Sequence, residues 1–331
     1  MGSMARIVLG LCSSHSPQLN TPSDVWPEHG SNDQRNPWLI DREGRRLSYA
    51  EAVERADPRI GREELTPEKH AQRHAAVQAA VERLQSELAA AKPDVVVVFG
   101  DDQAEIFPDD FRPALMVYSG ETVPNMPDLF TRAPYEAGRK AGWAYGPEQD
   151  TIEIKSDLAR HLVDSLIEAE FDIGHAAKLN PGVGLGHAYG FVFGRIMNGA
   201  TAPMVPVIIN TLYPPNQPTP RRCYELGEAV RSAILSFPAD LRVAVVGSGG
   251  LSHFLVDEDL DRRFLQAVRN KDSETMKGLP AKRLQSGTGE IRSWLAAVAA
   301  VQDLALDFVE YQACYRSPAG SGMGMGFAVW K

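Results

Sequence analysis

The sequence predicts an α/β fold, in which a layered mixed β-sheet is flanked by helices. Short apolar segments alternate along the chain with segments whose apolar residues recur at helical spacing, and such alternation is typical of layered sheets. One apolar segment contains four consecutive valines, which suits a strand buried on both faces. Hydrophobic residues make up 44% of the 331 residues and charged residues 23%, the balance of a folded globular protein.

Four segments have the composition expected of buried strands. They are rich in β-branched and other apolar residues, which pack well on a pleated surface. We predict strands at Arg6–Leu11, Val95–Phe99, Met204–Asn210 and Arg242–Val246.

Four further segments are predicted to be helices. The first begins after Thr66, a residue suited to cap a helix, and Pro67 is favoured at the first helical position. Its apolar face is marked at helical spacing by Val77, Val81, Leu84 and Leu88. Similar spacing predicts helices at 158–169, 223–235 and 291–304.

The chain is predicted to form a single domain over residues 5–331, because no repeat or linker divides it. Residues 18–64 are polar, rich in proline and weakly periodic, so we interpret them as an N-terminal insertion that covers the surface as a lid. Residues 1–4 are interpreted as a tag remnant, because a second methionine stands at position 4.

Charge and apolar patterning exclude several classes of partner. The net charge of -9 argues against nucleic acid, whose recognition requires a positive surface. No apolar run approaches the ~20 residues of a membrane helix, and no secretory segment is recognisable, so we expect a cytoplasmic protein without membrane contact. The three cysteines are too few and too scattered for a disulfide framework, and we expect free thiols.

Polar side chains follow three of the predicted strands at the point where each strand ends. His15 follows the first, the stretch "GDDQ" at 100–103 follows the second, and His253 follows the strand at Arg242–Val246. Loops at strand ends carry side chains on a rigid frame, and ligands of α/β sheets bind there. The sequence therefore predicts a site at these strand ends.

Six motifs resemble those of the class III extradiol ring-cleavage dioxygenases, typified by the catalytic β subunit of protocatechuate 4,5-dioxygenase. They are "SSHSP", "PDVVVVFGDDQ", "GLGHAYGFVFG", "YPPNQPTPRRCYELG", "GSGGLSHF" and "SGTGEIRSW". The resemblance covers most of residues 5–305, with the 18–64 insertion outside it. The single-chain form, with its Pro-rich motif, looks closest to the 3-O-methylgallate dioxygenase branch.

The resemblance implies a non-heme Fe(II) ion held by two histidines and a glutamate. His15 matches the first ligand and Glu290 the carboxylate ligand. His253 corresponds to the acid/base histidine of the family, and His187 to a second active-site histidine that positions or protonates substrate and oxygen.

The second histidine ligand of the family falls on Gln103. A glutamine oxygen is a neutral and weaker donor to Fe(II) than an imidazole nitrogen. Three explanations stay open: Gln103 binds the metal itself, Asp102 does so, or a histidine from elsewhere supplies the nitrogen, with His29 and His175 as candidates.

The resemblance implies that the enzyme opens a lignin-derived catechol such as 3-O-methylgallate, gallate or protocatechuate with O2, and that it forms a homodimer. A carboxylate on the ring would need a cation in the pocket of this acidic protein, and Arg221 and Arg222 are the candidates, with Tyr213 and Tyr189 as hydrogen-bond donors. Two alternatives stay open: a binding protein without oxygenase chemistry, or a metal-dependent hydrolase.

Overall fold

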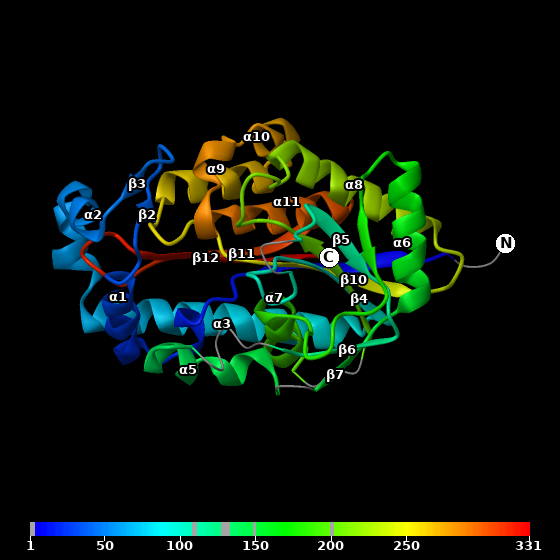
Figure 1. The fold of residues 1–331 in the computed structure, drawn as a ribbon, viewed down its shortest axis with the longest axis horizontal. Helices are drawn as coiled ribbons and strands as arrows, with labels where there is room; N and C mark the ends of the chain where they lie inside the picture. Colours follow the sequence, from blue (N-terminus) through cyan, green and yellow to red (C-terminus); the bar gives the residue numbers. More distant parts are fainter. Residues whose placement is uncertain (1–3, 108–110, 127–132, 148–149, 199–201) are drawn as a thin grey trace.

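A computed structural model describes residues 4–107, 111–126, 133–147, 150–198 and 202–331. Most of the interpreted tag remnant, residues 1–3, lies outside the described residues. The fold is a mixed α/β arrangement built around one eight-stranded sheet, as predicted (Figure 1). The order across that sheet is β11-β12-β1-β10-β4-β9-β5-β8. Its strands are β1 Arg6–Ser13, β4 Val95–Gly100, β5 Leu115–Tyr118, β8 Gly174–Ala176, β9 Met204–Ile209, β10 Arg242–Ser248, β11 Leu306–Tyr315 and β12 Gly322–Trp330.

The middle of the sheet consists of four parallel neighbours, β1, β10, β4 and β9. Residue pairs such as Val243 with Val95, and Val96 with Met204, fix their register. Because the four strands run in the same direction, their carboxyl ends meet at one edge of the sheet. The predicted strand-end residues are therefore brought together at this edge.

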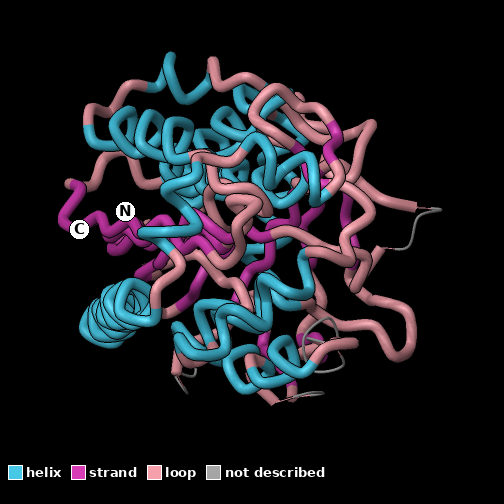
Figure 2. Tube along the Cα trace, turned by 90° about the vertical axis from the view of Figure 1, so that its left-hand side faces the viewer, coloured by secondary structure: helices cyan, strands magenta, loops and turns pink. Residues whose placement is uncertain are grey.

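Helices cover both faces of the sheet. Along β4, Val95 and Val97 pack in one core cluster and Val96 and Val98 in the other, as the two-residue period of a strand requires. The first face is covered by α6 (Ser156–Glu168), α8 (Pro220–Ser236), α9 (Glu258–Arg269) and α11 (Ile291–Ala300), and the second by α3 (Pro67–Ala91) and α7 (His187–Phe191). Figure 2 shows the strands as a layer between these two groups of helices.

The predicted helices are confirmed, with one shorter than expected. Thr66 caps α3 by accepting a hydrogen bond at 3.2 Å from the backbone N–H of Lys69. The helix predicted at 291–304 ends at Ala300 instead, and turns occupy 301–303. Within the described residues, no helix combines the length and apolar character needed to cross a bilayer.

The 18–64 segment contains several short elements and lies at one end of the sheet (Figure 1). They are two 3-10 turns (Gln18–Asn20 and Ser23–Val25), α1 (Trp26–Asp33), β2 (Leu39–Ile40) paired with β3 (Arg46–Leu47), α2 (Tyr49–Arg55) and a π-helical turn (Ile60–Glu64). Trp26 and Asp33 of α1 are buried. The segment therefore contributes to the interior as well as to the surface.

The remaining elements are short. They are the paired strands β6 (Thr122–Pro124) and β7 (Thr151–Glu153), the helices α5 (Glu136–Lys140) and α10 (Ser273–Lys277), the 3-10 turns Gly142–Tyr145, Ala281–Arg283 and Ser286–Glu290, and the π-helical turn Val192–Ile196.

Candidate metal centre

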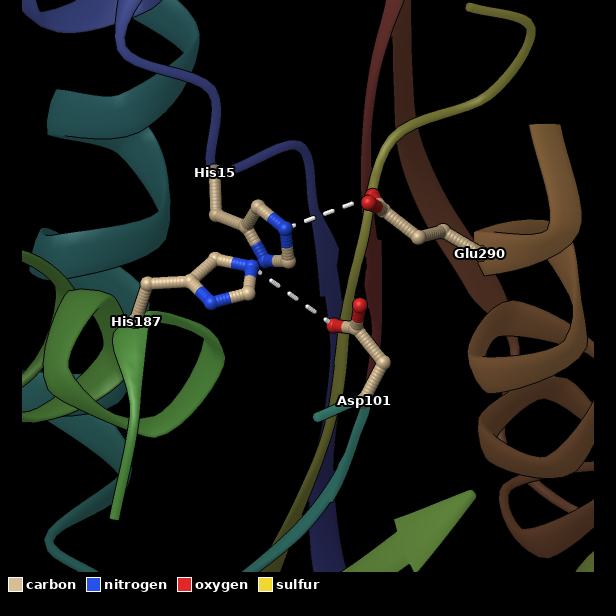
Figure 3. Close-up of side chains that lie close together, drawn as sticks. All are labelled: His15, Asp101, His187 and Glu290. Carbon is tan, nitrogen blue, oxygen red and sulfur yellow. Dashed lines mark ion pairs between the residues drawn. The ribbon is translucent and has the colours of Figure 1, made fainter. Parts of the chain in front are cut away.

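Four buried side chains meet at the carboxyl edge of the parallel strands and form a cluster of possible metal ligands, the donor cluster: His15, Asp101, His187 and Glu290 (Figure 3). Each offers one nitrogen or oxygen atom, and these atoms all lie within 4.8 Å of one another. His15 follows β1, Asp101 follows β4, His187 begins α7 and Glu290 immediately precedes α11. Two imidazoles and two carboxylates at this spacing could hold a metal ion.

The hydrogen bonds of His15 determine which of its nitrogens faces the cluster. Its Nδ1 lies 3.0 Å from the hydroxyl of Ser248, and that hydroxyl donates its single proton to the carbonyl of Ala188 at 2.7 Å. Ser248 must therefore accept a hydrogen bond from Nδ1–H of His15. Nε2 is therefore the nitrogen that faces Glu290 Oε2, 3.3 Å away, and without a proton it can offer its lone pair to a metal ion.

His253 approaches the other oxygen of Glu290 in the same way. Nδ1–H of His253 donates to the carbonyl of Leu251 at 2.9 Å, and Nε2 lies 3.2 Å from Glu290 Oε1. Burial by itself would lower the pKa of His253, but the Glu290 carboxylate outweighs burial and raises that pKa above its ordinary value. His253 therefore lies beside the donor cluster as a group that can hold a proton.

The two carboxylates of the cluster respond differently to burial. Burial favours the neutral form of Glu290, but His253 and His15 outweigh it and hold its pKa well below the ordinary value. Burial and the Glu290 charge raise the pKa of Asp101, whose Oδ1 is buried and has no hydrogen-bond partner among the described residues. A bound cation would reduce the repulsion between the Asp101 and Glu290 carboxylates and would also accept the His15 lone pair. The residues present therefore fit a metal ion.

His187 is held by a carboxylate that the sequence analysis did not identify, Glu105. The Nδ1 atom of His187 lies 2.6 Å from Glu105 Oε2, and the backbone N–H of His187 donates to Glu105 Oε1 at 2.8 Å. A side chain at Gly186 would collide with this carboxylate. Burial opposes protonation of His187, but Glu105 and Asp101 outweigh it and raise its pKa to about 10.

Gln103 and Asp102 have distinct positions in the "GDDQ" stretch. The amide nitrogen of Gln103 lies 3.3 Å from Glu290 Oε1 and 3.4 Å from Asp101 Oδ2, so Gln103 borders the donor cluster. Asp102 instead accepts hydrogen bonds from the backbone N–H groups of residues 104–107. Asp102 therefore stabilises the turn after β4, and both of its carboxylate oxygens are used in these hydrogen bonds.

The two other histidine candidates for the third ligand lie outside the cluster. His29 hydrogen-bonds the hydroxyl of Thr21 at 3.1 Å, and burial, helped by Arg316, lowers its pKa to about 3. His175 lies on the edge strand β8 and hydrogen-bonds Ser119 at 2.6 Å. The structure brings neither of them to the donor atoms.

The residues predicted to contact substrate have other partners. Arg222 stacks on the ring of Phe171, with 3.6 Å between its Cζ atom and the ring centroid, and Arg221 is exposed and lies 3.6 Å from Glu274. Tyr213 stacks against Arg112, and Tyr189 donates to the carbonyl of Val207 within the core. The structure does not bring Arg221, Arg222 or Tyr213 to the cavity beside the donor cluster.

The donor cluster opens into a cavity of about 90 Å³. Of the predicted site residues, its lining contains His15, Gln103, His187, His253 and Glu290. Tyr135 and Arg316 also line it, and the sequence analysis missed both because no motif distinguishes them. A larger cavity of about 610 Å³ lies beside the β2–β3 hairpin, but its lining includes none of the four donors. The smaller cavity is lined by His15, Ser16, Pro17, Gln103, Tyr135, His187, His253, Phe254, Glu290, Arg316, Gly322 and Met323.

Comparison with known sequences points to one family. The family described as the catalytic LigB subunit of aromatic ring-opening dioxygenase matches residues 57–326. A 2,3-dihydroxyphenylpropionate/2,3-dihydroxicinnamic acid 1,2-dioxygenase of Comamonas testosteroni is 28% identical over 199 residues, which cover 59% of this chain and 55% of that protein.

Two further relatives have names that denote related activities. A protein of the same name from Mycobacterium ulcerans is 32% identical over 185 residues, covering 54% of this chain and 49% of the relative. A gallate dioxygenase of Pseudomonas putida is 38% identical over 123 residues, covering 34% of this chain and 35% of the relative. The matched part therefore spans about half the length of the first two relatives and about a third of the gallate dioxygenase.

Proposed function

The chain belongs to the family of the catalytic LigB subunit of aromatic ring-opening dioxygenases, and from this premise we propose that it is an Fe(II)-dependent extradiol dioxygenase. The observation that carries the proposal is the buried cluster of two histidines and two carboxylates at the carboxyl edge of the sheet. The substrate is a catechol, the second substrate is O2, and both enter the cavity beside that cluster. We extend the proposal to lignin-derived catechols such as 3-O-methylgallate, gallate or protocatechuate, and to a homodimer.

We assign the metal ligands from the contacts of each donor. His15 and Glu290 are the first two, because His15 Nε2 and Glu290 Oε2 lie 3.3 Å apart and could bind one ion between them. Asp101 is the third, in place of the Gln103 expected from the motif, because its buried Oδ1 has no hydrogen-bond partner among the described residues. Fe(II) bound there would lower the pKa of a coordinated catechol hydroxyl and supply the redox chemistry with O2.

The chain's own residues would handle the protons. His253 accepts the second hydroxyl proton of the catechol, because its Nε2 faces the cluster and its Nδ1–H is fixed by the Leu251 carbonyl. His187 holds a proton against Glu105, with a pKa of about 10, and can deliver it to oxygen atoms in the cavity. Phe254 and Met323 line the same cavity and supply apolar contacts to the ring.

The ligand assignment makes a first prediction about iron content. Asp101→Asn is expected to lose nearly all bound iron, because the amide removes the charge of a ligand. Gln103→Ala is expected to weaken iron binding by about 10- to 100-fold, the effect of removing a neighbour that orients ligands. Iron is measured after anaerobic Fe(II) loading and removal of the excess, with His175→Ala as the control.

The opposite pattern would reverse this assignment. Wild-type iron content in Asp101→Asn, together with complete loss in Gln103→Ala, would make Gln103 the third ligand. His175→Ala should retain iron in either case, because that ring lies on the edge strand β8 and away from the donor atoms.

The activity itself is tested with the wild-type protein. After anaerobic loading with Fe(II), addition of O2 and a panel of catechols is expected to give oxygen uptake and a yellow ring-opened product. Hydrolysis of an ester or amide panel without oxygen uptake, in the zinc-loaded protein, would instead support a hydrolase, a chemistry compatible with two carboxylate donors. Catechol binding without turnover would support a binding protein.

A further inference from the structure

One wall of the cavity contains a buried guanidinium that the proposed chemistry does not use. Arg316 lies in the turn between β11 and β12, and its side chain is 9% exposed. Among the described residues that line the cavity, it is the only lysine or arginine. The cavity therefore offers one cationic side chain beyond the donor cluster.

A carboxylate from the 18–64 segment holds Arg316 in place. Nε and Nη2 of Arg316 each donate to one oxygen of Asp33 at 2.7 Å, a two-point ion pair with Asp33 2% exposed. Nη1 donates to the amide oxygen of Gln18 at 3.2 Å. A guanidinium bound at two points has a defined orientation, so this one is fixed before any ligand arrives.

The backbone around Arg316 fits closely against α1. A side chain at Gly30 would collide with the backbone oxygen of Arg316. The backbone N–H of Arg316 donates to Ser321 at 2.8 Å, and the hydroxyl of Ser321 donates to Asp33. Helix α1 and the β11–β12 turn therefore form one packed unit around the guanidinium.

Arg316 can still donate to a ligand. A guanidinium has five N–H groups, and the bonds to Asp33 and Gln18 use three of them, which leaves two. A carboxylate is the group that best matches paired N–H donors of this kind. Tyr135 also lines the cavity, and its phenol supplies a further donor. Burial raises the pKa of Tyr135, and the positive charge of Arg316 opposes that rise.

We propose that Arg316, oriented by Asp33, receives the carboxylate of an aromatic acid and so selects catechols that have an acid group. This rests on the proposed function, because it requires a catechol in the cavity. The part of the chain that orients Arg316 comes from residues 18–64, whereas the family match begins at residue 57. Asp33 and Gln18 thus give this segment a role in substrate choice.

A binding experiment tests the proposal independently of ring opening. The Fe(II)-loaded protein is titrated without oxygen against 4-hydroxybenzoate and against 4-methylphenol, neither of which has the two adjacent hydroxyls of a catechol. The wild-type protein is expected to bind the acid about 10- to 100-fold more tightly, the factor that a hydrogen bond to a charged group supplies. Equal affinity for the two compounds would overturn the proposal.

Two variants identify the group responsible. Replacing only Arg316 would leave Asp33 buried and unpaired, so the double variant Asp33→Asn with Arg316→Met removes both charges together. Its preference for the acid should fall to within about threefold of unity if the charged hydrogen bond is its source. The control is Arg222→Met, because Arg222 stacks on Phe171 away from the cavity, and it should keep the wild-type preference.

Further measurements separate the possible failures. A double variant that keeps the preference would overturn the proposal. If the double variant does not fold, Arg316→Lys takes its place, because lysine keeps the charge but loses the two-point bond to Asp33. This variant should show a reduced preference for the acid, and an unchanged preference would overturn the proposal.

The proposal and the proposed function can fail separately. A wild-type protein that opens no catechol yet shows the Arg316-dependent preference would contradict only the proposed function. In an active protein, the same ratio should appear in KM for protocatechuate against 4-methylcatechol.

Discussion

His15→Ala is expected to leave the protein without bound iron and without ring-opening activity. Nε2 of His15 lies 3.3 Å from Glu290 Oε2, and alanine offers no metal-binding atom in its place. Removing groups that only orient metal ligands costs about 10- to 100-fold in affinity, so removal of a ligand should cost at least as much. The measurement is iron content after anaerobic loading, followed by oxygen uptake with a catechol substrate.

A second histidine variant controls for general effects on the fold. His161→Ala removes an imidazole that hydrogen-bonds Ala233 and Ser236, apart from the donor cluster, and should retain both iron and activity. Circular dichroism of His15→Ala should match that of the wild-type protein. A folded His15→Ala variant that still loads fully with iron and opens catechols would show that His15 is not a ligand.

His253→Ala is expected to keep its iron and to lose turnover by about 10²- to 10⁴-fold, the range for removal of a general acid or base. The imidazole contacts Glu290 Oε1 at 3.2 Å, but the proposed ligand set does not include it. Its raised pKa, which the Glu290 carboxylate causes, suits a group that takes up a substrate proton. Steady-state kcat and iron content in the same preparation test both parts.

Phe254→Ala provides the matched comparison for His253→Ala. Phe254 lines the same cavity but has no group that titrates, so its removal should raise KM more than it lowers kcat. Unchanged kcat in an iron-loaded His253→Ala variant would remove the general-base assignment. Loss of iron from that variant would instead move His253 into the ligand set.

The parallel centre of the sheet was predictable because its strands are locally distinctive. Strand β4 presents valines to both faces of the sheet. Thr66 and Pro67 mark the start of α3. Strands β11 and β12 were not predicted, although they pair over nine positions. The sequence of β12, "GMGMGFAVW", is rich in glycine and resembles a loop, and only pairing with β1 and β11, distant in sequence, makes it a buried strand.

Parts of the candidate site were equally hidden from local sequence. His15 and Glu290 were found from motifs, and the structure brings them together. Asp101 and its neighbour Asp102 both suit a turn, so the sequence does not distinguish them. In the structure, Asp101 points to the donor cluster, whereas Asp102 accepts hydrogen bonds from the backbone of the turn. A cation for an acidic substrate was expected at Arg221 and Arg222, which the structure does not bring to the cavity. Arg316 does line the cavity, and its position depends on an ion pair with the distant Asp33, which no local motif indicates.

The assembly of the centre from segments that are distant in the sequence also affects how the polypeptide would retain a metal. The proposed ligands His15, Asp101 and Glu290 are far apart in the sequence, so the unfolded chain has no preformed site for the ion, and unfolding should release the metal. Free Fe(II) at about a hundred times its dissociation constant would add roughly 2.7 kcal/mol to the free energy of unfolding. The bound ion would thus link segments that are distant in the sequence. Chelators should therefore lower the stability of the whole protein as well as abolish its activity.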